Sequence, residues 1–458
     1  MTPTPSAANP NASKAPRTLH IVLNGVTEDS RVLKCAWSLG NAGWDVLVTG
    51  ATATAESDEL TIGYSKIQRL PLKIVISKAK SPKPLRFLIR GEKTEWLIRG
   101  ILRRLRKYRR AITAKIGVKR EIVVPNLARS VKIITPIALE YKPQVVHAHD
   151  YTALPIAGAI VESLRRAGYS SHLVYDAHEY VPGVAHLTAP MANLYTKYER
   201  RYSKLASAVL SVSEPMNDLL MDQLQITTRP TIVANDPLVE GQQPAKRNLR
   251  EDIGVGPEVP LLVYSGAVAP QRGIQTAVDA LVELPDVHIA LIANPKSKSV
   301  MDLVDRAKDV ADRFHVVPYV PNSELVSYLS TADVGLIPIL HRLNHEISLI
   351  TKFGEYMQAR LPIIVSDVKT MAAEVRKLGN GEVFIAEDVE DFVKATRAVL
   401  AEPAKYRAAY TAEVLAERSW ENQAAILLST YNRIAGVESV ARPHLPFTIS
   451  EPVKLPLQ

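Results

Sequence analysis

Short apolar runs rich in β-branched residues alternate with longer helical patterns along most of this chain, and this alternation restricts its fold more than any other feature. A strand, a helix and a second strand in succession favour a parallel sheet, because a long crossover must return the chain to the same end of the sheet. The sequence therefore predicts an α/β fold with two Rossmann-like domains. Five strands are predicted in each half, at 18–25, 44–50, 144–150, 172–178 and 208–213, and at 260–266, 287–293, 315–320, 334–339 and 362–367.

The length of the chain and one break in the pattern agree with two domains. At 458 residues the chain is too long for one ordinary core. Residues 236–258 carry Pro, Gly and mixed charge without a sustained period, which predicts a linker between two sheets that face each other across a cleft. The predicted parts are a disordered tail at 1–17, an N-terminal domain at 18–238, a C-terminal domain at 239–418, a helix at 419–435 and a similar tail at 436–458.

The net charge of +9 implies acidic partners, and one segment supplies more than the whole excess. Residues 78–132 hold eighteen Lys and Arg against three Glu, mixed with aliphatic and aromatic side chains. This mixture fits an amphipathic basic helix that contacts an anionic membrane surface. A solvated pair of helices covering the sheet is the alternative. Nucleic acid is not expected as a partner, because no recognised binding module accompanies the charge.

Cysteine content and hydropathy bear on the compartment. Cys35 is the single cysteine, so no intramolecular disulfide can form, and we expect a buried, unreactive thiol in a reducing compartment. No run reaches the roughly 18 apolar residues of a membrane-spanning helix, and the N-terminus lacks the apolar core of a signal peptide. We expect a cytoplasmic protein, peripheral at the inner membrane face if the basic segment binds lipid.

Ionisable residues end two predicted strands of the first half. His149 and Asp150 end one strand, and Asp176, His178 and Glu179 end the next. In open α/β sheets, ligands bind outside the carboxyl ends of the strands. Imidazole can donate or accept a proton near neutral pH, and a neighbouring carboxylate fixes its tautomer. These five residues are therefore candidates for the acceptor side of a cleft, while helix capping and strand-end polarity are the alternative explanation.

The second half offers groups suited to a nucleotide. The strand at 260–266 ends on Gly266, and a short loop leads to Arg272 at the start of a helix, where backbone N–H groups and a fixed charge suit an anion. An ordinary turn would contain the same glycine. Lys352 and Glu355 stand three apart, hence on one face of a helix. They can form a surface pair, or the ammonium can bind phosphate while the carboxylate accepts from ribose hydroxyls.

Taken in order, these segments resemble the family-4 retaining glycosyltransferases, which have the two-domain GT-B fold. SLITKFGEYMQARLPIIVSD and YSGAVAPQRGIQTAVDAL are similar to the family's nucleotide segment and diphosphate loop. EDSRVLKCAWSLGNAGWDVLVTG, VYDAHEY, SAVLSVSEPM and IVANDPL are similar to elements of its acceptor-side domain. SWENQAAILLSTYNRI is similar to its closing helix, which returns to the N-terminal domain. The resemblance runs from about Leu19 to Ile434.

The resemblance implies that a hexose-type sugar moves from a nucleotide diphosphate sugar to an acceptor with retained configuration, without a cofactor or metal. Glu355 would hold the ribose hydroxyls, Arg272 and Lys352 would neutralise the diphosphate, and His178 would lie beside the reacting sugar. His178, Arg272 and Lys352 are thus the candidate catalytic residues. The departing diphosphate would deprotonate the acceptor, whose identity the sequence does not reveal. A lipid-linked acceptor or a cell-surface glycan would agree with the basic segment.

Three positions depart from the family pattern. Ala267 stands where many relatives carry Arg, and Ile347 stands where many carry the first of two Glu, with Glu346 one step away as a candidate substitute. Asn24 and Gly25 stand where relatives often show a Gly-Gly pair, and we expect Gly25 near the donor.

Two alternative functions of proteins with the same fold stay open. A nucleotide-sugar epimerase would consume donor without an acceptor, and a catalytically silent protein would bind donor without turnover.

Overall fold

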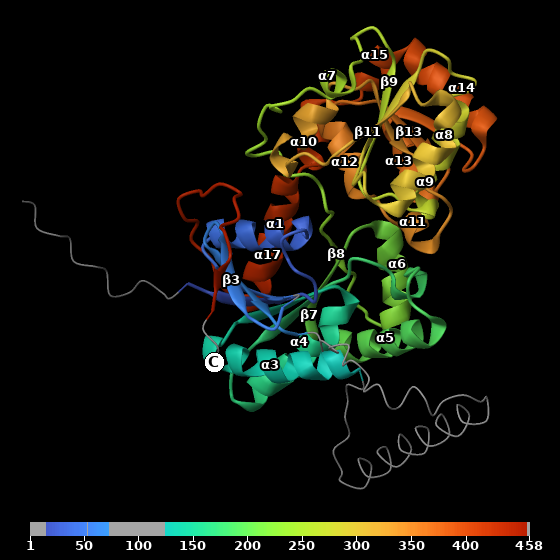
Figure 1. Cartoon of the computed structure of the whole chain (residues 1–458). Coiled ribbons are helices and arrows are strands. Elements are labelled where there is room, and N and C mark those ends of the chain that lie inside the picture. Colours follow the sequence, from blue (N-terminus) through green and yellow to red (C-terminus); the bar gives the residue numbers. More distant parts are fainter. Residues whose placement is uncertain (1–14, 53, 73–123, 456–458) are drawn as a thin grey trace, which may run out of the picture.

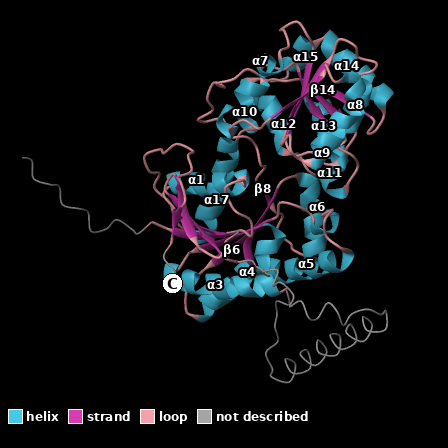
Figure 2. Ribbon diagram, viewed as in Figure 1, coloured by secondary structure: helices cyan, strands magenta, loops and turns pink. Residues whose placement is uncertain are grey.

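The computed structural model of the protein describes residues 15–52, 54–72 and 124–455, which form two lobes (Figure 1). Most of the predicted N-terminal tail and most of the basic segment 78–132 lie outside the described residues. Each lobe consists of a sheet flanked by helices, as Figure 2 shows. Among the described helices, none is both long and apolar enough to cross a membrane.

The N-terminal lobe contains a nine-stranded sheet in the order β15-β3-β4-β2-β1-β5-β6-β7-β8. Strands β4 to β8 in this order are parallel, whereas β3 and β15 add antiparallel edges. The strands are β1 Arg17–Ile21, β2 Asp45–Ala51, β3 Asp58–Ile62, β4 Ser65–Leu70, β5 Val145–His149, β6 His172–Asp176, β7 Ala206–Ser211, β8 Thr231–Ile232 and β15 Val453–Lys454.

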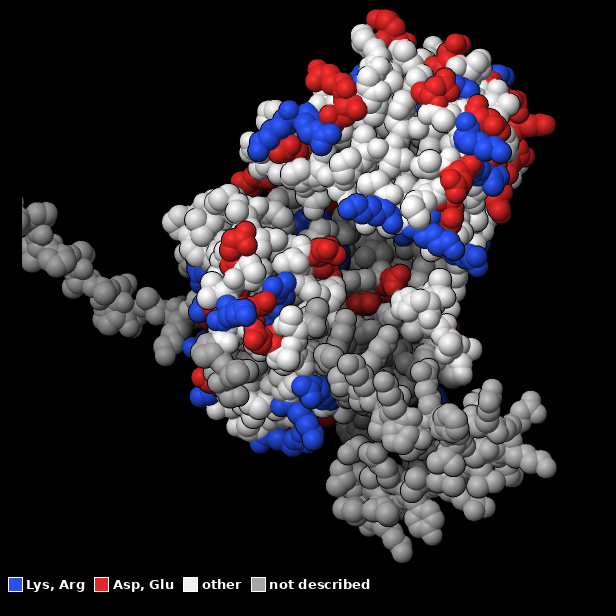
Figure 3. Space-filling model, viewed as in Figure 1, with Lys and Arg blue, Asp and Glu red and all other residues white. Residues whose placement is uncertain are grey.

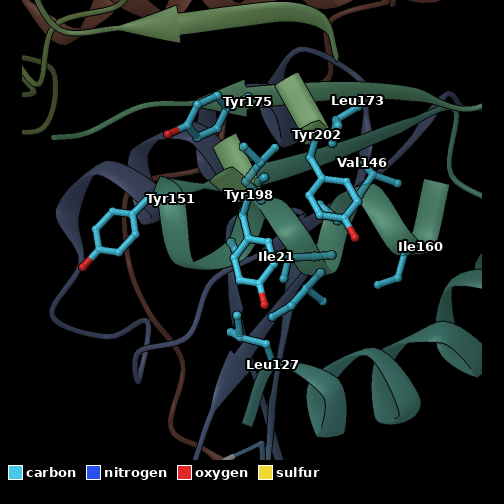
Figure 4. Packing of buried hydrophobic residues seen from close by; sticks show 14 of the residues in the cluster. Ile21, Leu127, Val146, Tyr151, Ile160, Leu173, Tyr175, Tyr198 and Tyr202 are labelled. Carbon is cyan, nitrogen blue, oxygen red and sulfur yellow. The ribbon is translucent and has the colours of Figure 1, made fainter. Parts of the chain in front are cut away.

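Alternate strand residues face two different helix layers, because successive side chains of a strand point to opposite sides. Ile21 and Val146 pack with Ile160 of α4 and the tyrosines of α5 (Figure 4). The opposite face packs against α1 and α17, where Trp37 and Trp420 are buried. The helices of this lobe are α1 Ser30–Asn41, α3 Pro125–Tyr141, α4 Asp150–Arg166, α5 Ala189–Tyr202, α6 Glu214–Leu224 and the returning helix α17 Trp420–Ala435.

The C-terminal lobe contains a six-stranded parallel sheet in the order β11-β10-β9-β12-β13-β14. This is the doubly wound order 3-2-1-4-5-6, whose ligand crevice opens where the strand order reverses, here between β9 and β12. The strands are β9 Leu261–Ser265, β10 His288–Ile292, β11 Phe314–Val317, β12 Val334–Ile337, β13 Ile363–Ser366 and β14 Gly381–Phe384. The helices are α7 Leu249–Ile253, α8 Ile274–Ala280, α9 Lys298–Arg306, α10 Asn322–Leu329, α11 Leu343–Ile347, α12 Thr351–Gln358, α13 Lys369–Leu378, α14 Val389–Ala401, α15 Pro403–Arg407 and α16 Ala412–Glu417.

All ten predicted strands are present, and the prediction of two Rossmann-like domains is confirmed. The prediction of an unstructured tail after residue 435 is wrong for residues 437–455. The Trp37 indole donates a hydrogen bond of 2.8 Å to Leu445 O, and the Phe447 ring meets Trp37 edge-on at 5.6 Å. Val453 and Lys454 extend the sheet by pairing with β3. A segment poor in internal hydrogen bonds is ordered here because an open sheet edge and an aromatic surface bind it.

The lobes contact each other on two sides of the space between them. On one side the interdomain chain meets the returning helix, since Trp420 N–H donates to Pro237 O at 2.8 Å. On the other side α11 of the C-terminal lobe meets the N-terminal lobe, where Tyr180 N–H donates to Asn344 Oδ1 at 3.0 Å. Ile347 of α11 is buried in the N-terminal core, and Ser213 donates to its carbonyl oxygen. The cleft is therefore held between two contacts.

Candidate functional site

A cavity of about 650 Å³ lies between the lobes, and Figure 3 shows this hollow with Lys and Arg on its C-terminal edge. Its walls come from the ends of β9 and β10, the start of α12, the loop before α11 and the segment after β6. The predicted residues His178, Glu179, Gly266, Arg272, Lys352 and Glu355 line it. The structure thus brings groups from both halves of the sequence to one ligand-sized space.

Gly266 and Lys352 line the cavity on the side of the C-terminal lobe. Gly266 has φ +123°, a conformation that side chains disfavour, and a Cβ atom there would lie 3.4 Å from Lys352 Nζ. Lys352 Nζ lies 3.3 Å from the Tyr264 hydroxyl and 4.5 Å from the centre of its ring. Burial, with a smaller contribution from Arg272, lowers the pKa of Lys352 to about 7. At neutral pH this side chain is therefore partly the neutral amine, which can gain a proton when an anion binds.

Glu355 and Arg272 complete this wall. Burial raises the pKa of Glu355, although the charges of Lys352 and Lys34 act in the opposite direction. Arg272 ends the short helical turn Pro270–Arg272, and among the described residues no carboxylate pairs with it. An arginine without a carboxylate partner, a lysine whose pKa is lowered and a glutamate whose pKa is raised are what an empty site built for a diphosphate and a sugar hydroxyl would show.

Asp176 is buried in the N-terminal lobe behind His178, a residue that lines the cavity. Arg31 of α1 binds it in a bidentate pair, with Nε 2.8 Å from Oδ2 and the second nitrogen 2.7 Å from Oδ1. His178 Nε2 lies 3.1 Å from Oδ2. Burial alone would raise the pKa of Asp176, but the charges of Arg31 and His178 and the hydrogen bonds of this site hold the pKa well below its ordinary range. Asp176 is therefore an ionised anchor, fully buried.

His178 presents its ring to the cavity with 21% of its side chain exposed. Burial lowers its pKa, but the charge and hydrogen bond of Asp176 outweigh burial, so the pKa is raised overall. Because Nε2 carries the proton that faces Asp176, Nδ1 is the nitrogen left for a ligand.

Of the other acceptor-side candidates, Glu179 lines the cavity, whereas His149 and Asp150 do not. Glu179 is exposed and lines the cavity, whereas His149 is fully buried with Nδ1 3.5 Å from Asp176 Oδ2. Asp150 has φ +69°, and burial raises the pKa of its carboxyl to about 7. Asp150 is not among the cavity-lining residues, so we remove it and His149 from the candidates for direct contact.

Two donor-side predictions are corrected by the structure. Glu346 accepts from Lys369 N–H at 2.8 Å and pairs with His341, so its carboxylate is committed at the start of α13 and does not line the cavity. It therefore does not take the place of the family carboxylate. Gly25 is an exposed loop residue that also does not line the cavity.

Several lining residues were missed by the sequence reasoning. Arg31 lies within the EDSRVL stretch that resembled the family, but its bond to Asp176 spans 145 positions and leaves no local signal. Asn344 reaches the cavity from the short helix α11, and Asn235 reaches it from the segment after β8. Their positions depend on how the lobes meet.

Two groups of side chains each hold their imidazole or carboxylate atoms within 4.8 Å of one another, a spacing that a metal ion could bridge. They are His20, His147 and His149, and His149, Asp176 and His178. In the structure, however, His20 Nδ1 lies 2.9 Å from His149 Nε2, a hydrogen-bond distance, and Arg31 takes both oxygens of Asp176. Hydrogen bonding thus uses most of these atoms, and we assign no metal to them.

Two family models cover most of the chain. Residues 29–236 match a glycosyl transferase 4-like domain, and residues 259–402 match the glycosyl transferases group 1. The chain belongs to the GT-B glycosyltransferases. Its N-terminal domain is of the family-4-like type, in agreement with the resemblance found in the sequence.

Relatives of this glycosyltransferase family member are distant. It is 24% identical over 261 residues to 2-deoxystreptamine glucosyltransferase of Streptomyces kanamyceticus, covering 54% of this chain and 65% of that one. It is 22% identical over 311 residues to D-inositol 3-phosphate glycosyltransferase of Mycobacterium marinum, covering 64% of each. These matches span less than two thirds of the relatives' length.

Solved structures share its fold. Sucrose-phosphate synthase of Thermosynechococcus elongatus matches with a TM-score of 0.66 at 17% identity, covering 92% of this chain and 99% of that one. Anabaena HepE in complex with UDP matches with a TM-score of 0.61 at 12% identity, covering 91% and 100%. At these identities the likeness concerns the fold alone.

Proposed function

We propose that the protein transfers a hexose-type sugar from a nucleotide diphosphate sugar to an acceptor hydroxyl, with retained configuration. The observation that carries this proposal is the convergence of Arg272, Lys352 and Glu355 on one wall of a cavity that His178 faces from the other lobe. Solved relatives of the same fold hold UDP, UDP-glucose and UDP-2-fluoro glucose, which supports a nucleotide sugar as the donor.

In this proposal the diphosphate lies over Gly266, between the Arg272 guanidinium and the Lys352 ammonium. Both cations stabilise the negative charge that grows on the diphosphate as the bond to the sugar breaks, and such contacts are typically worth about 2 to 4 kcal/mol of barrier each. Glu355 accepts hydrogen bonds from the ribose hydroxyls. The sugar then lies against His178, and the departing diphosphate takes the acceptor proton on the same face, so the chain needs no separate base.

The test compares Glu355→Ala and Arg272→Ala with the wild type by thermal shift, using the diphosphates of uridine, guanosine, adenosine and thymidine and their glucose conjugates. A ligand that binds the folded state raises the melting temperature with the logarithm of its saturation. We expect one nucleotide to stabilise the wild type, both variants to lose this stabilisation and any transfer, and their own folding to be intact. Glu346→Ala is the matched control and should keep the ligand response, since Glu346 lies outside the cavity.

Two results would contradict the proposal. One is a wild type that no nucleotide diphosphate or nucleotide sugar stabilises, and the other is a Glu355→Ala variant that binds as the wild type does. An epimerase would convert the donor with no acceptor present, and a silent binding protein would bind donor without ever turning it over, so product analysis separates both alternatives from a transferase.

We further propose that the basic segment 78–132 brings the cleft to an anionic membrane surface, where a lipid-linked acceptor would be available. Support comes only from its eighteen basic residues and its apolar content. Vesicles containing anionic lipid should retain the protein at low salt and release it as salt rises, because surface electrostatics is screened. Retention that is indifferent to lipid charge would dismiss this contact.

A further inference from the structure

A closed ring of polar side chains lies beneath the N-terminal wall, on the sheet face that α1 and α17 cover. His20 of β1 stands opposite His147 of β5 in the strand register, and His149 stands opposite Asp176 of β6, so these four side chains point to the same face. Tyr431 of α17 reaches the same cluster from the returning helix. All five side chains are fully buried, with exposed fractions of 0%.

Five contacts join these groups into a ring. His149 Nε2 lies 2.9 Å from His20 Nδ1, and His20 Nε2 lies 3.2 Å from the Tyr431 hydroxyl. The same hydroxyl lies 2.6 Å from His147 Nδ1. The ring closes on Asp176, whose Oδ2 lies 3.5 Å from His147 Nε2 and 3.5 Å from His149 Nδ1.

The ring has one hydrogen fewer than its contacts need for hydrogen bonding. Each of the five contacts needs one hydrogen, whereas three neutral imidazoles and one hydroxyl supply four, because a neutral imidazole has a single N–H. The shortage falls at the carboxylate, since His147 Nε2 and His149 Nδ1 are the two ring atoms without a hydrogen-bond partner. The hydrogen bonds can run around the ring in either of two directions. In one of them His147 donates to Asp176 and His149 turns a lone pair toward it, and in the other the two histidines exchange these roles.

The three histidines stay neutral because they are buried. Burial, followed by the charge of His149, lowers the pKa of His147 to about 3. Burial also lowers the pKa of His20 well below its ordinary value and lowers that of His149. No additional proton therefore fills the empty contact at neutral pH.

The groups around the ring do not remove the shortage. The Thr18 hydroxyl donates to the tyrosine oxygen at 3.5 Å and supplies no hydrogen to the five contacts. Arg31 from α1 is the one cation paired with Asp176 among the described residues besides the histidines. The Cys35 thiol, whose pKa burial raises to about 12, is neutral. The charge of Asp29, at the N-cap of α1, raises the pKa of His149, and that of Asp150, the first residue of α4, raises the pKa of His178.

A metal ion is a poorer explanation than a missing hydrogen. The rings of His147 and His149 are stacked, with centroids 4.0 Å apart and planes only 15° from parallel, so their nitrogen lone pairs run side by side and do not converge. Arg31 also occupies both oxygens of the carboxylate that such an ion would need. A divalent cation beside this guanidinium would add an uncompensated buried charge.

We propose that His20, His147, His149 and Tyr431 are positioning residues for His178, and that their shortage of one hydrogen makes Asp176 hold the His178 Nε2–H more strongly and favour the charged imidazolium. A carboxylate that receives fewer hydrogen bonds is more basic and stabilises a neighbouring cation more. His178 then offers a positively charged Nδ1–H donor to the cavity. This step rests on the proposed function, in which that donor faces the bond between sugar and diphosphate.

The decisive variant is Tyr431→Phe, because it removes one hydrogen and two contacts and so ends the shortage. The three remaining contacts then have three hydrogens, and both His147 and His149 can donate to Asp176. The better-solvated carboxylate holds His178 less strongly. We expect the pKa of His178 to fall by about 0.5 unit or more, the size that one hydrogen bond of ordinary strength would give.

The measurement is an NMR titration of full-length protein with ¹⁵N-labelled histidine, in which His178→Gln identifies the His178 signals. The nitrogen shifts should show Nε2–H as the neutral tautomer of His178 and a pKa above 6.5 in the wild type. Thr430→Val is the matched control, because it removes a neighbouring buried hydroxyl of α17 that bonds to Ile426 O outside the ring. It should leave the titration of His178 unchanged whatever it does to stability.

Three outcomes would overturn the inference. They are an Nδ1–H tautomer of His178, a Tyr431→Phe variant that melts lower while the pKa of His178 is unchanged, and stoichiometric binding of added Zn²⁺ that moves the His147 and His149 signals. The tautomer is read in the wild type, so the test holds even if Tyr431→Phe does not fold. Titration needs no substrate, so a protein that fails to bind nucleotides would refute the proposed function without touching this result.

Discussion

Acidification should destabilise the N-terminal lobe through its buried histidines. An unfolded imidazole has a pKa near 6.5, whereas burial holds the pKa of His147 at about 3 and that of His20 well below the ordinary value. Between these limits the unfolded chain binds protons that the folded chain does not. The stability due to these two residues is therefore present above about pH 6.5 and is lost as the pH falls, down to the folded pKa values.

The magnitude follows from this difference in proton binding. From pH 7 to pH 5 His147 loses about 2 kcal/mol of unfolding free energy, and the loss at His20 has the same sign. Other buried groups act in the opposite sense. Burial raises the pKa of Glu199 to about 8 and that of Asp150 to about 7, so the folded chain also gains protons over this range. The total pH profile is a sum, and only a difference between variants isolates the histidines.

The assay compares the wild type with the double variant His20→Gln/His147→Gln in urea unfolding at pH 7, 6 and 5. Tryptophan fluorescence reports on this lobe, because the three described tryptophans, Trp37, Trp44 and Trp420, all lie in its core. The variant should be less stable at pH 7 but should lose at least about 2 kcal/mol less than the wild type on acidification, the contribution of His147. Parallel curves would refute the claim that these histidines are neutral.

His444→Gln provides the control for that comparison. The His444 side chain is 48% exposed on the C-terminal segment, so its substitution removes no buried imidazole. Its curve should run parallel to that of the wild type.

Two further predictions concern the cleft. At pH 7 the empty site holds Lys352 partly deprotonated, since its pKa is lowered to about 7, and a bound diphosphate should restore the full charge. Binding should take up about half a proton, seen by calorimetry in two buffers of different ionisation enthalpy, and no uptake in the wild type or the same uptake in Lys352→Met would contradict it. Ile347→Glu should separate the lobes, because it places a charge in the N-terminal core at a cost of about 3 kcal/mol or more. A larger radius of gyration in X-ray scattering would show this separation. An unchanged radius of gyration, with tighter binding of the nucleotide, would contradict the role of Ile347 in joining the lobes.

Local chemistry explains why much of the site could be found in advance. Gly266 and Arg272 are close in the sequence, as are Lys352 and Glu355. Each pair follows a strand of the C-terminal sheet, and ligands bind outside the carboxyl ends of such strands, so both pairs could be expected at one sheet edge. Glu346 shows the limit of such reasoning. A single step in a short helix turns its carboxylate toward His341 and α13, away from the cavity, and only the packing of α11 between the lobes decides that direction.

The sequence by itself determined the two α/β sheets and the cationic wall of the cleft, because hydrophobic period and local spacing act over a few residues. The tertiary structure decided the rest. It joined Arg31 to Asp176, closed the ring of His20, His147, His149 and Tyr431, and laid the C-terminal segment on β3. These contacts link residues up to hundreds of positions apart, and their energies depend on burial and register, which exist only once the sheets have packed.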